Sequence, residues 1–116
     1  MSKVYHFSSE KLSVTKQAMQ AFYESKEDFF DYLKRHQSGD WGEVGNYEEI
    51  RLSKDEIQTG MSNNTAKLNL LQIKNKQNGS IMSIYKLRNG TKIWIVTCLD
   101  FLADQAYTTI FLPSEY

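Results

Sequence analysis

The residues best suited to chemistry are a histidine and an aspartate four positions apart. His36 and Asp40 fall in the stretch His-Gln-Ser-Gly-Asp-Trp-Gly at residues 36–42. An imidazole beside a carboxylate makes an acid–base pair, which would suit a small hydrolase or transferase. The spacing crosses a predicted helix end and a glycine, so it does not by itself bring the two side chains together. The simpler interpretation is structural: Asp40 binds backbone amides of the glycine turn, and His36 caps the helix.

Other catalytic or metal-binding arrangements have weaker support. Cys98 is the single cysteine of the chain, and it falls among apolar residues in a predicted strand. We therefore expect a buried, inert thiol rather than a nucleophile activated by His36 or His6. One cysteine and two separated histidines give no zinc-binding pattern, and the acidic residues give no magnesium-binding pattern. We expect neither a metal nor a cofactor.

A binding surface is predicted around a basic and aromatic hairpin. The turn at residues 88–91 contains Asn-Gly, the strongest short-range signal for a β-hairpin. Basic side chains next to aromatic rings on a sheet can bind single-stranded nucleic acid, although lysines also serve to protect sheet edges. The predicted binding residues are Trp41, Tyr85, Lys86, Arg88, Lys92 and Trp94.

The charges are balanced overall but divided along the chain. The 116 residues carry 14 basic and 14 acidic side chains, so the formal net charge is zero. Residues 57–99 contain six basic and no acidic residues, whereas residues 24–56 contain ten acidic and five basic residues. A nucleic-acid-binding domain is usually strongly basic, so that function is not favoured. The division predicts two solvated faces of opposite sign, which could also orient a charged protein partner.

Length and hydropathy predict one domain in the cytoplasm. A chain of 116 residues, 41% of them hydrophobic, fits one domain with a real core. We find no stretch that approaches the ~20 apolar residues of a membrane span. The start of the chain also lacks the apolar region of a secretory signal.

The first half of the chain predicts helices. Residues 13–23 show an apolar stripe at helical spacing, with Ser13 as N-cap. Ser25 is predicted to begin a second helix, which would bury Phe29, Phe30 and Leu33. A Ser-x-x-Glu capping box at residues 53–56 predicts a short third helix, and residues 66–73 fit either a helix or a strand. Residues 3–7 could form an edge strand.

The last third predicts three antiparallel strands at residues 80–87, 92–99 and 106–112. The middle run is almost continuously apolar, so we expect a central strand with both faces partly covered. Alternation should turn Ile93 and Ile95 toward the helices. The predicted fold class is α+β, with two to three N-terminal helices packed on a three-stranded antiparallel meander of order 1-2-3. The helical part spans about residues 9–73 and the meander about 80–113 of a single domain.

Several rare residues occur in an order that resembles a known family. The pattern is His-x-x-Gly-Asp-Trp-Gly, then Ser-x-Tyr, Asn-Gly, Thr-Lys-x-Trp-x-x-Thr, and finally Thr-Thr-x-x-Leu-Pro-x-Glu-Tyr. It covers roughly residues 29–116 and is similar to the small "plasmid-related proteins" of mobile elements, some loosely labelled type I restriction subunits. This chain departs from the pattern by extra residues within 46–78 and by its segment 98–105. The first 28 residues also look particular to this chain.

The resemblance implies no tested activity, so three functions follow as hypotheses. The first is a non-enzymatic accessory factor that contacts a host or element-encoded protein, including one of host defence. The second is a small enzyme using His36 and Asp40, and the third is a nucleic-acid-binding module using the basic hairpin. A free sheet edge would also allow a homodimer.

Overall fold

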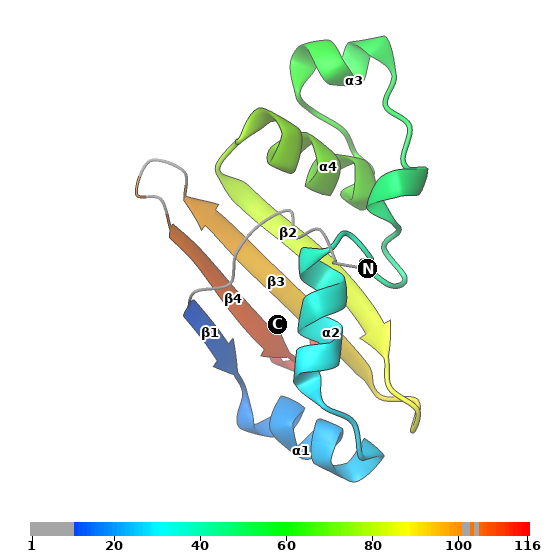
Figure 1. The fold of residues 1–116 in the computed structure, drawn as a ribbon, viewed down its shortest axis with the longest axis vertical. Helices are drawn as coiled ribbons and strands as arrows, with labels where there is room; N and C mark the ends of the chain where they lie inside the picture. The colour runs from blue at the N-terminus through cyan, green and yellow to red at the C-terminus, as the bar shows by residue number, and fades with distance from the viewer. Residues whose placement is uncertain (1–10, 101–102, 104) are drawn as a thin grey trace.

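The computed structural model describes residues 11–100, 103 and 105–116, and the predicted meander forms most of its sheet (Figure 1). Three antiparallel strands follow one another as expected, and a fourth strand pairs in parallel with the last of them. The sheet is therefore mixed, with the order β1-β4-β3-β2. Its strands are β1 (Lys11–Val14), β2 (Gly79–Lys86), β3 (Lys92–Asp100) and β4 (Gln105–Phe111).

Strand β1 was not predicted. Because it occupies residues up to Val14, the first helix begins later than expected. Val14, expected in the helical stripe, is instead the last residue of β1, beside Ile110. Thr15 is the N-cap in place of Ser13, because its side chain accepts a hydrogen bond from the Ala18 amide. The strand suggested at residues 3–7 lies outside the described residues.

Among the described residues there are four α-helices, and each begins at a side chain that accepts a hydrogen bond from the first turn. The second helix is capped by Asp28, and Ser25, predicted to begin it, is the last residue of the first helix. The capping box of Ser53 and Glu56 is confirmed, and the undecided segment is a helix. The helices are α1 (Lys16–Ser25), α2 (Phe29–Gln37), α3 (Lys54–Thr59) and α4 (Thr65–Asn75), with 3₁₀ turns η1 (Tyr47–Glu49) and η2 (Pro113–Glu115).

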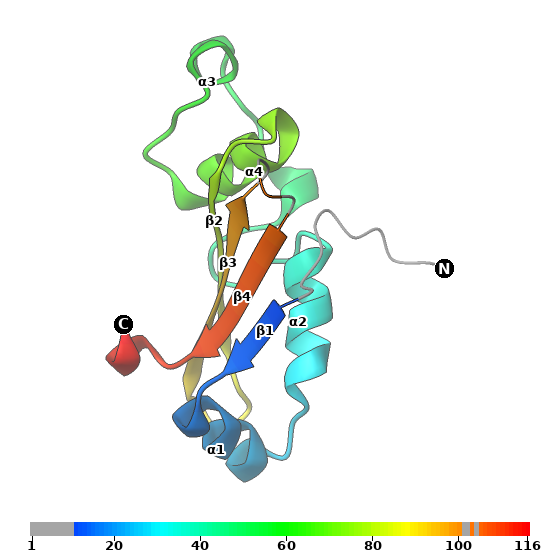
Figure 2. The same cartoon turned by 90° about the vertical axis from the view of Figure 1, so that its left-hand side faces the viewer.

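The core lies between the helices and one side of the sheet, which we call the inner face. Ile93 and Ile95 are fully buried there, as predicted. Phe30 was predicted to be buried but is 50% exposed, because α2 turns Tyr32 and Leu33 toward the sheet instead. In the edge-on view, α2 lies on one side of the sheet and the C-terminal turn on the other (Figure 2).

The β2 edge of the sheet is covered by side chains and by a loop. The Asn69 amide donates to the Met82 carbonyl (2.9 Å) and accepts from the Met82 amide (3.1 Å), as a neighbouring strand would. Gln72 donates to the Ser80 carbonyl at 2.9 Å. Farther along, the Ile84 carbonyl accepts from the Glu43 amide at 2.8 Å. Backbone groups that could pair with another strand are thus already bonded, so a homodimer through this edge is not favoured.

We expect Asn69→Ala to destabilise the protein by ~2 kcal/mol, because it leaves the Met82 amide and carbonyl without their partner. Urea unfolding followed by circular dichroism measures this change. Asn63→Ala is the matched control, because Asn63 is exposed. Equal stability of the two variants would show that Asn69 does not support the strand.

Candidate functional site

The predicted acid–base residue His36 lies in the core. Its ring is fully buried, with Nδ1 2.5 Å from Ser83 Oγ and Nε2 2.9 Å from Thr97 Oγ1. Thr97 Oγ1 in turn lies 2.7 Å from Thr108 Oγ1. These four side chains form one hydrogen-bonded chain that connects α2 to β2, β3 and β4. A histidine in this position supports the packing of the helix on the sheet and has no open route to a substrate.

Burial also keeps His36 neutral. The pKa of its imidazole falls from 6.5 to about 3, because the apolar surroundings disfavour the charged ring. A general base that works near neutral pH needs a pKa close to 7, so this environment does not suit one.

The Asp40 carboxylate pairs with Arg35. The Arg35 guanidinium donates to it through Nε at 2.7 Å and Nη2 at 3.4 Å. The same guanidinium lies over the Tyr85 ring, 4.7 Å from its centroid. This hydrogen bonding to Asp40 raises the pKa of Arg35, so the pair stays ionised. The contact holds the end of α2 against the loop that follows.

Trp41 was predicted to be a binding residue, but it is a core residue of that loop. Its ring is fully buried and donates from Nε1 to the His36 carbonyl at 3.1 Å. Tyr85, also buried, donates to the Asp40 carbonyl at 2.6 Å. Gly42 has a φ of +64°, and an added Cβ would lie 2.1 Å from the Ile84 carbonyl oxygen. The motif at residues 36–42 therefore joins α2 to the edge of β2, and neither aromatic ring faces solvent.

The basic residues of the hairpin are exposed, and two of them have acidic neighbours. Arg88 Nε lies 3.7 Å from Glu27, and Lys92 Nζ lies 3.2 Å from Glu43. Lys86 is directly opposite Lys92 across the strand pair. The acidic segment of the sequence thus folds against the basic one. This proximity lowers the local positive charge that a phosphate backbone would require.

The remaining predicted binding residue, Trp94, lies on the side of the sheet that faces away from α1 and α2, which we call the outer face. Its neighbours there are Ile84 on one side and Phe111 on the other. Trp94, Ile84 and Val96 are half-buried, whereas Tyr107 is 42% exposed. Apolar side chains therefore line a face that remains open to solvent. Sequence alternation had assigned Trp94 to this face, and the C-terminal turn supplies the partial covering expected there.

Cys98 also lies on the outer face, and its predicted burial is wrong. The thiol is exposed and 3.9 Å from Ser80 Oγ. The prediction rested on its apolar neighbours Val96 and Leu99, but the covering of this face does not reach Cys98. Its suggested partner His6 lies outside the described residues, and His36 is on the inner face.

The C-terminus folds onto the outer face. Tyr116 is 88% exposed, but its ring centroid lies 5.3 Å from that of Trp94 and 6.1 Å from that of Phe111. Glu115 accepts hydrogen bonds from the Leu112 amide and the Thr15 hydroxyl, which fixes this turn. The rings of Trp94, Phe111 and Tyr116 thus form an aromatic cluster.

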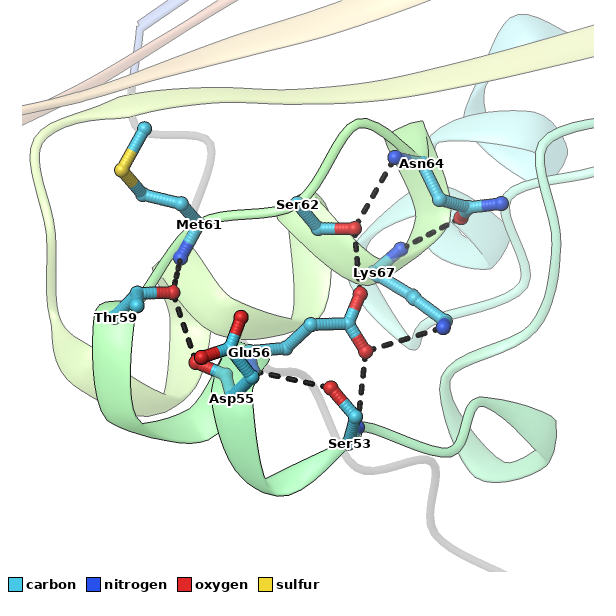
Figure 3. A network of polar contacts seen from close by, with 8 residues as sticks. All are labelled: Ser53, Asp55, Glu56, Thr59, Met61, Ser62, Asn64 and Lys67. Carbon is cyan, nitrogen blue, oxygen red and sulfur yellow. Dashed lines mark hydrogen bonds and ion pairs between the residues drawn. The ribbon is translucent and has the colours of Figure 1, made fainter.

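The segment within residues 46–78 contains a polar network that holds α3 against α4 (Figure 3). Glu56 accepts from the Ser53 amide (2.9 Å), the Ser62 hydroxyl (2.8 Å) and Lys67 Nζ (3.1 Å). These bonds, and the one from the Ser53 amide most of all, lower the pKa of Glu56 to about 2. Both carboxylate oxygens of Glu56 thus accept hydrogen bonds from other residues of the chain. The described residues contain no group of three side chains that could hold a metal ion.

Comparisons of the chain with protein-family models, curated proteins and solved structures gave no match. No helix within the described ranges is long and apolar enough to cross a membrane. The geometry of the site is therefore the evidence from which function has to be inferred.

Lowering the pH from 6.5 to 5 should destabilise the protein through His36. The unfolded chain binds a proton near pH 6.5, whereas the folded chain resists protonation until about pH 3. Stability is therefore complete above pH 6.5 and falls by up to ~1.4 kcal/mol per pH unit below it. Urea titrations at each pH should show this slope in the wild type and a smaller slope in His36→Gln. Equal slopes in the wild type and in His36→Gln would contradict the burial of the His36 ring.

Gly42→Ala should destabilise the fold by ~3 kcal/mol, because the new Cβ collides with the Ile84 carbonyl at a positive φ. Gly90→Ala is the matched control: its φ is +90°, but nothing lies within 4 Å of the added atom. That variant should lose only ~1 kcal/mol for the backbone conformation. Thermal melts of both variants test the difference, and a Gly42→Ala loss no larger than that of Gly90→Ala would refute the close approach.

Proposed function

We propose that this chain is a non-enzymatic protein-interaction module whose binding surface is the outer face of the sheet. The observation that carries the proposal is the position of Trp94, Ile84 and Val96 on a face that none of the helices α1 to α4 covers and that the C-terminal turn covers only in part. Contiguous apolar side chains on an accessible face mark sites of association in soluble proteins. Aromatic side chains supply most of the binding energy at such interfaces, and this face carries Trp94 and Tyr116, which pack on the buried Phe111.

The alternative functions have less support. Catalysis by His36 and Asp40 would require a substrate to reach a ring that is fully buried and bonded on both nitrogens. Nucleic-acid binding would require free positive charge, but Arg88 and Lys92 lie beside Glu27 and Glu43. Binding of a protein at the outer face requires neither access to the His36 ring nor free positive charge.

The resemblance to plasmid-related proteins suggests the setting of this interaction. An accessory factor of a mobile element acts in the host cytoplasm, and its partner is a protein of the host or of the element. A role against host defence fits that setting. The small size and the neutral net charge of the chain are compatible with a module that works by contact alone.

Val96→Glu should abolish protein binding, because it places a carboxylate in the middle of the outer face. The measurement is affinity capture from the natural host with tagged bait, with bound proteins quantified by mass spectrometry. Ile57→Glu is the matched control, because Ile57 is 60% exposed but lies on α3. We expect the wild type and the control to recover a stoichiometric protein and Val96→Glu to lose at least ten-fold. Recovery of neither a host protein nor another copy of the chain, or equal recovery by all three baits, would refute the proposal.

A further inference from the structure

The open edge of β1 is complementary to itself, and we infer that it pairs with β1 of a second copy of this chain. β1 bonds to β4 on one side, and no described element runs along its other side (Figure 1 and Figure 2). An antiparallel pair of β1 strands would join the two sheets into one continuous sheet. This edge is separate from the outer face, so the inference goes beyond the proposed function.

Two residues of β1 direct their backbone groups toward this edge. The Thr15 amide donates to the Ile110 carbonyl at 3.0 Å, so Thr15 faces β4. Because the hydrogen-bonding direction alternates along a strand, Ser13 also faces β4, whereas Leu12 and Val14 face away from it. Within the described ranges, no residue bonds to the backbone of Leu12 or Val14. Such a row of donors and acceptors is a template for another strand.

The other edge of the sheet is closed, which sets the β1 edge apart. Asn69, Gln72 and the loop at Glu43 bond the backbone groups of β2. Edge strands are also commonly protected by a lysine that projects from them. The lysine of β1 is Lys11, but its Nζ lies over the Tyr107 ring, 4.9 Å from the centroid. The described residues therefore cover the β2 edge and leave the β1 edge accessible.

The residue pattern of β1 is symmetric about Ser13. A two-fold axis through Ser13, perpendicular to the sheet, pairs Leu12 of each copy with Val14 of the other. Each of these pairs then exchanges both of its N–H···O=C bonds. Leu12 and Val14 pack on the core but remain half-buried, whereas Ile110 beside Val14 is fully buried. Pairing therefore covers apolar side chains that the monomer leaves partly exposed, which favours association.

Charge supports the same register. Lys11 comes opposite Thr15 of the other copy, with both side chains on the outer-face side. The Glu115 carboxylate accepts from the Thr15 hydroxyl at 2.9 Å, so each Lys11 lies near the Glu115 of the other copy. The exposed Lys11 side chain reaches this carboxylate by turning from the Tyr107 ring. Lys16, which follows Thr15, instead lines a groove between α1 and the turn of the hairpin.

The described elements leave room for this pairing. α1 begins directly after β1, but it runs below the end of the sheet toward α2, away from the β1 edge (Figure 1). The axis perpendicular to the sheet keeps both outer faces on the same side. The dimer would therefore present two copies of the outer face on one surface. A two-fold pairing of this kind is the commonest symmetry of soluble oligomers.

Sedimentation equilibrium of the purified full-length chain tests the inference. We expect the wild type to move from monomer to dimer between micromolar and millimolar concentration. Leu12→Pro removes the amide that faces the edge, which an edge strand tolerates, so its dissociation constant should rise at least ~ten-fold. Leu12→Ala is the matched control: it shortens the same side chain but keeps the amide, so it should dimerise more strongly than Leu12→Pro. Circular dichroism checks that both variants are folded.

An exchange of charges tests the register. Lys11→Glu places two carboxylates together at each end of the strand pair, and Glu115→Lys places two ammonium groups together there. Each variant alone should therefore dimerise at least ~ten-fold more weakly than the wild type. In an equimolar mixture the two variants bring opposite charges together at both ends, so a heterodimer should form with near wild-type affinity. Lys74→Glu, at an exposed site in the last turn of α4, controls for the change in net charge.

A wild type that stays monomeric at millimolar concentration would overturn the inference, as would a folded Leu12→Pro variant that dimerises as strongly as the wild type. Failure of the mixture to restore the dimer would exclude the antiparallel register. The proposed function is tested apart from this, because β4 separates Val96 on β3 from β1. Val96→Glu should dimerise like the wild type. In affinity capture, copies of the chain should then appear with every bait, and the host protein is what Val96→Glu loses.

Discussion

The contact on which the fold depends most is the hydrogen-bonded chain that begins at His36. One ring from α2 binds Ser83 on β2 and Thr97 on β3, and Thr97 extends the chain to Thr108 on β4. Polar groups in a core are costly unless every one is bonded, so this chain specifies how the helix sits on the three strands. Its consequence for function is indirect. The helical side of the sheet is filled, and the apolar side chains of the sheet that remain partly accessible lie on the outer face.

Local signals in the sequence predicted most of the elements, because they depend on neighbours a few residues apart. The Asn-Gly turn, the Ser53 capping box and the alternation around Ile95 all lie where they were expected. The errors concern long-range contacts. Strand β1 is only four residues long and depends on pairing with β4, which no local pattern reports. The exposure of Phe30 likewise depends on which side of α2 meets the sheet.

The candidate site was only partly predictable for the same reason. Trp94 and the lysines of the hairpin were named from the sequence, and they do lie at the outer face or its end. Trp41 and Tyr85 were named with them, but both are buried by residues distant in sequence. Whether an apolar strand is covered on one face or on both depends on the number of layers in the fold. That number is not encoded in the strand itself, and Cys98 was misplaced for this reason.

The accessibility of the Cys98 thiol tests the central claim most directly, because it reports on the outer face without any mutation. The single cysteine is exposed on that face. Its rate of reaction with an aromatic disulfide reagent in the folded protein should be close to the rate in the unfolded chain in urea. A rate in the folded protein far below that of the unfolded chain would contradict the account.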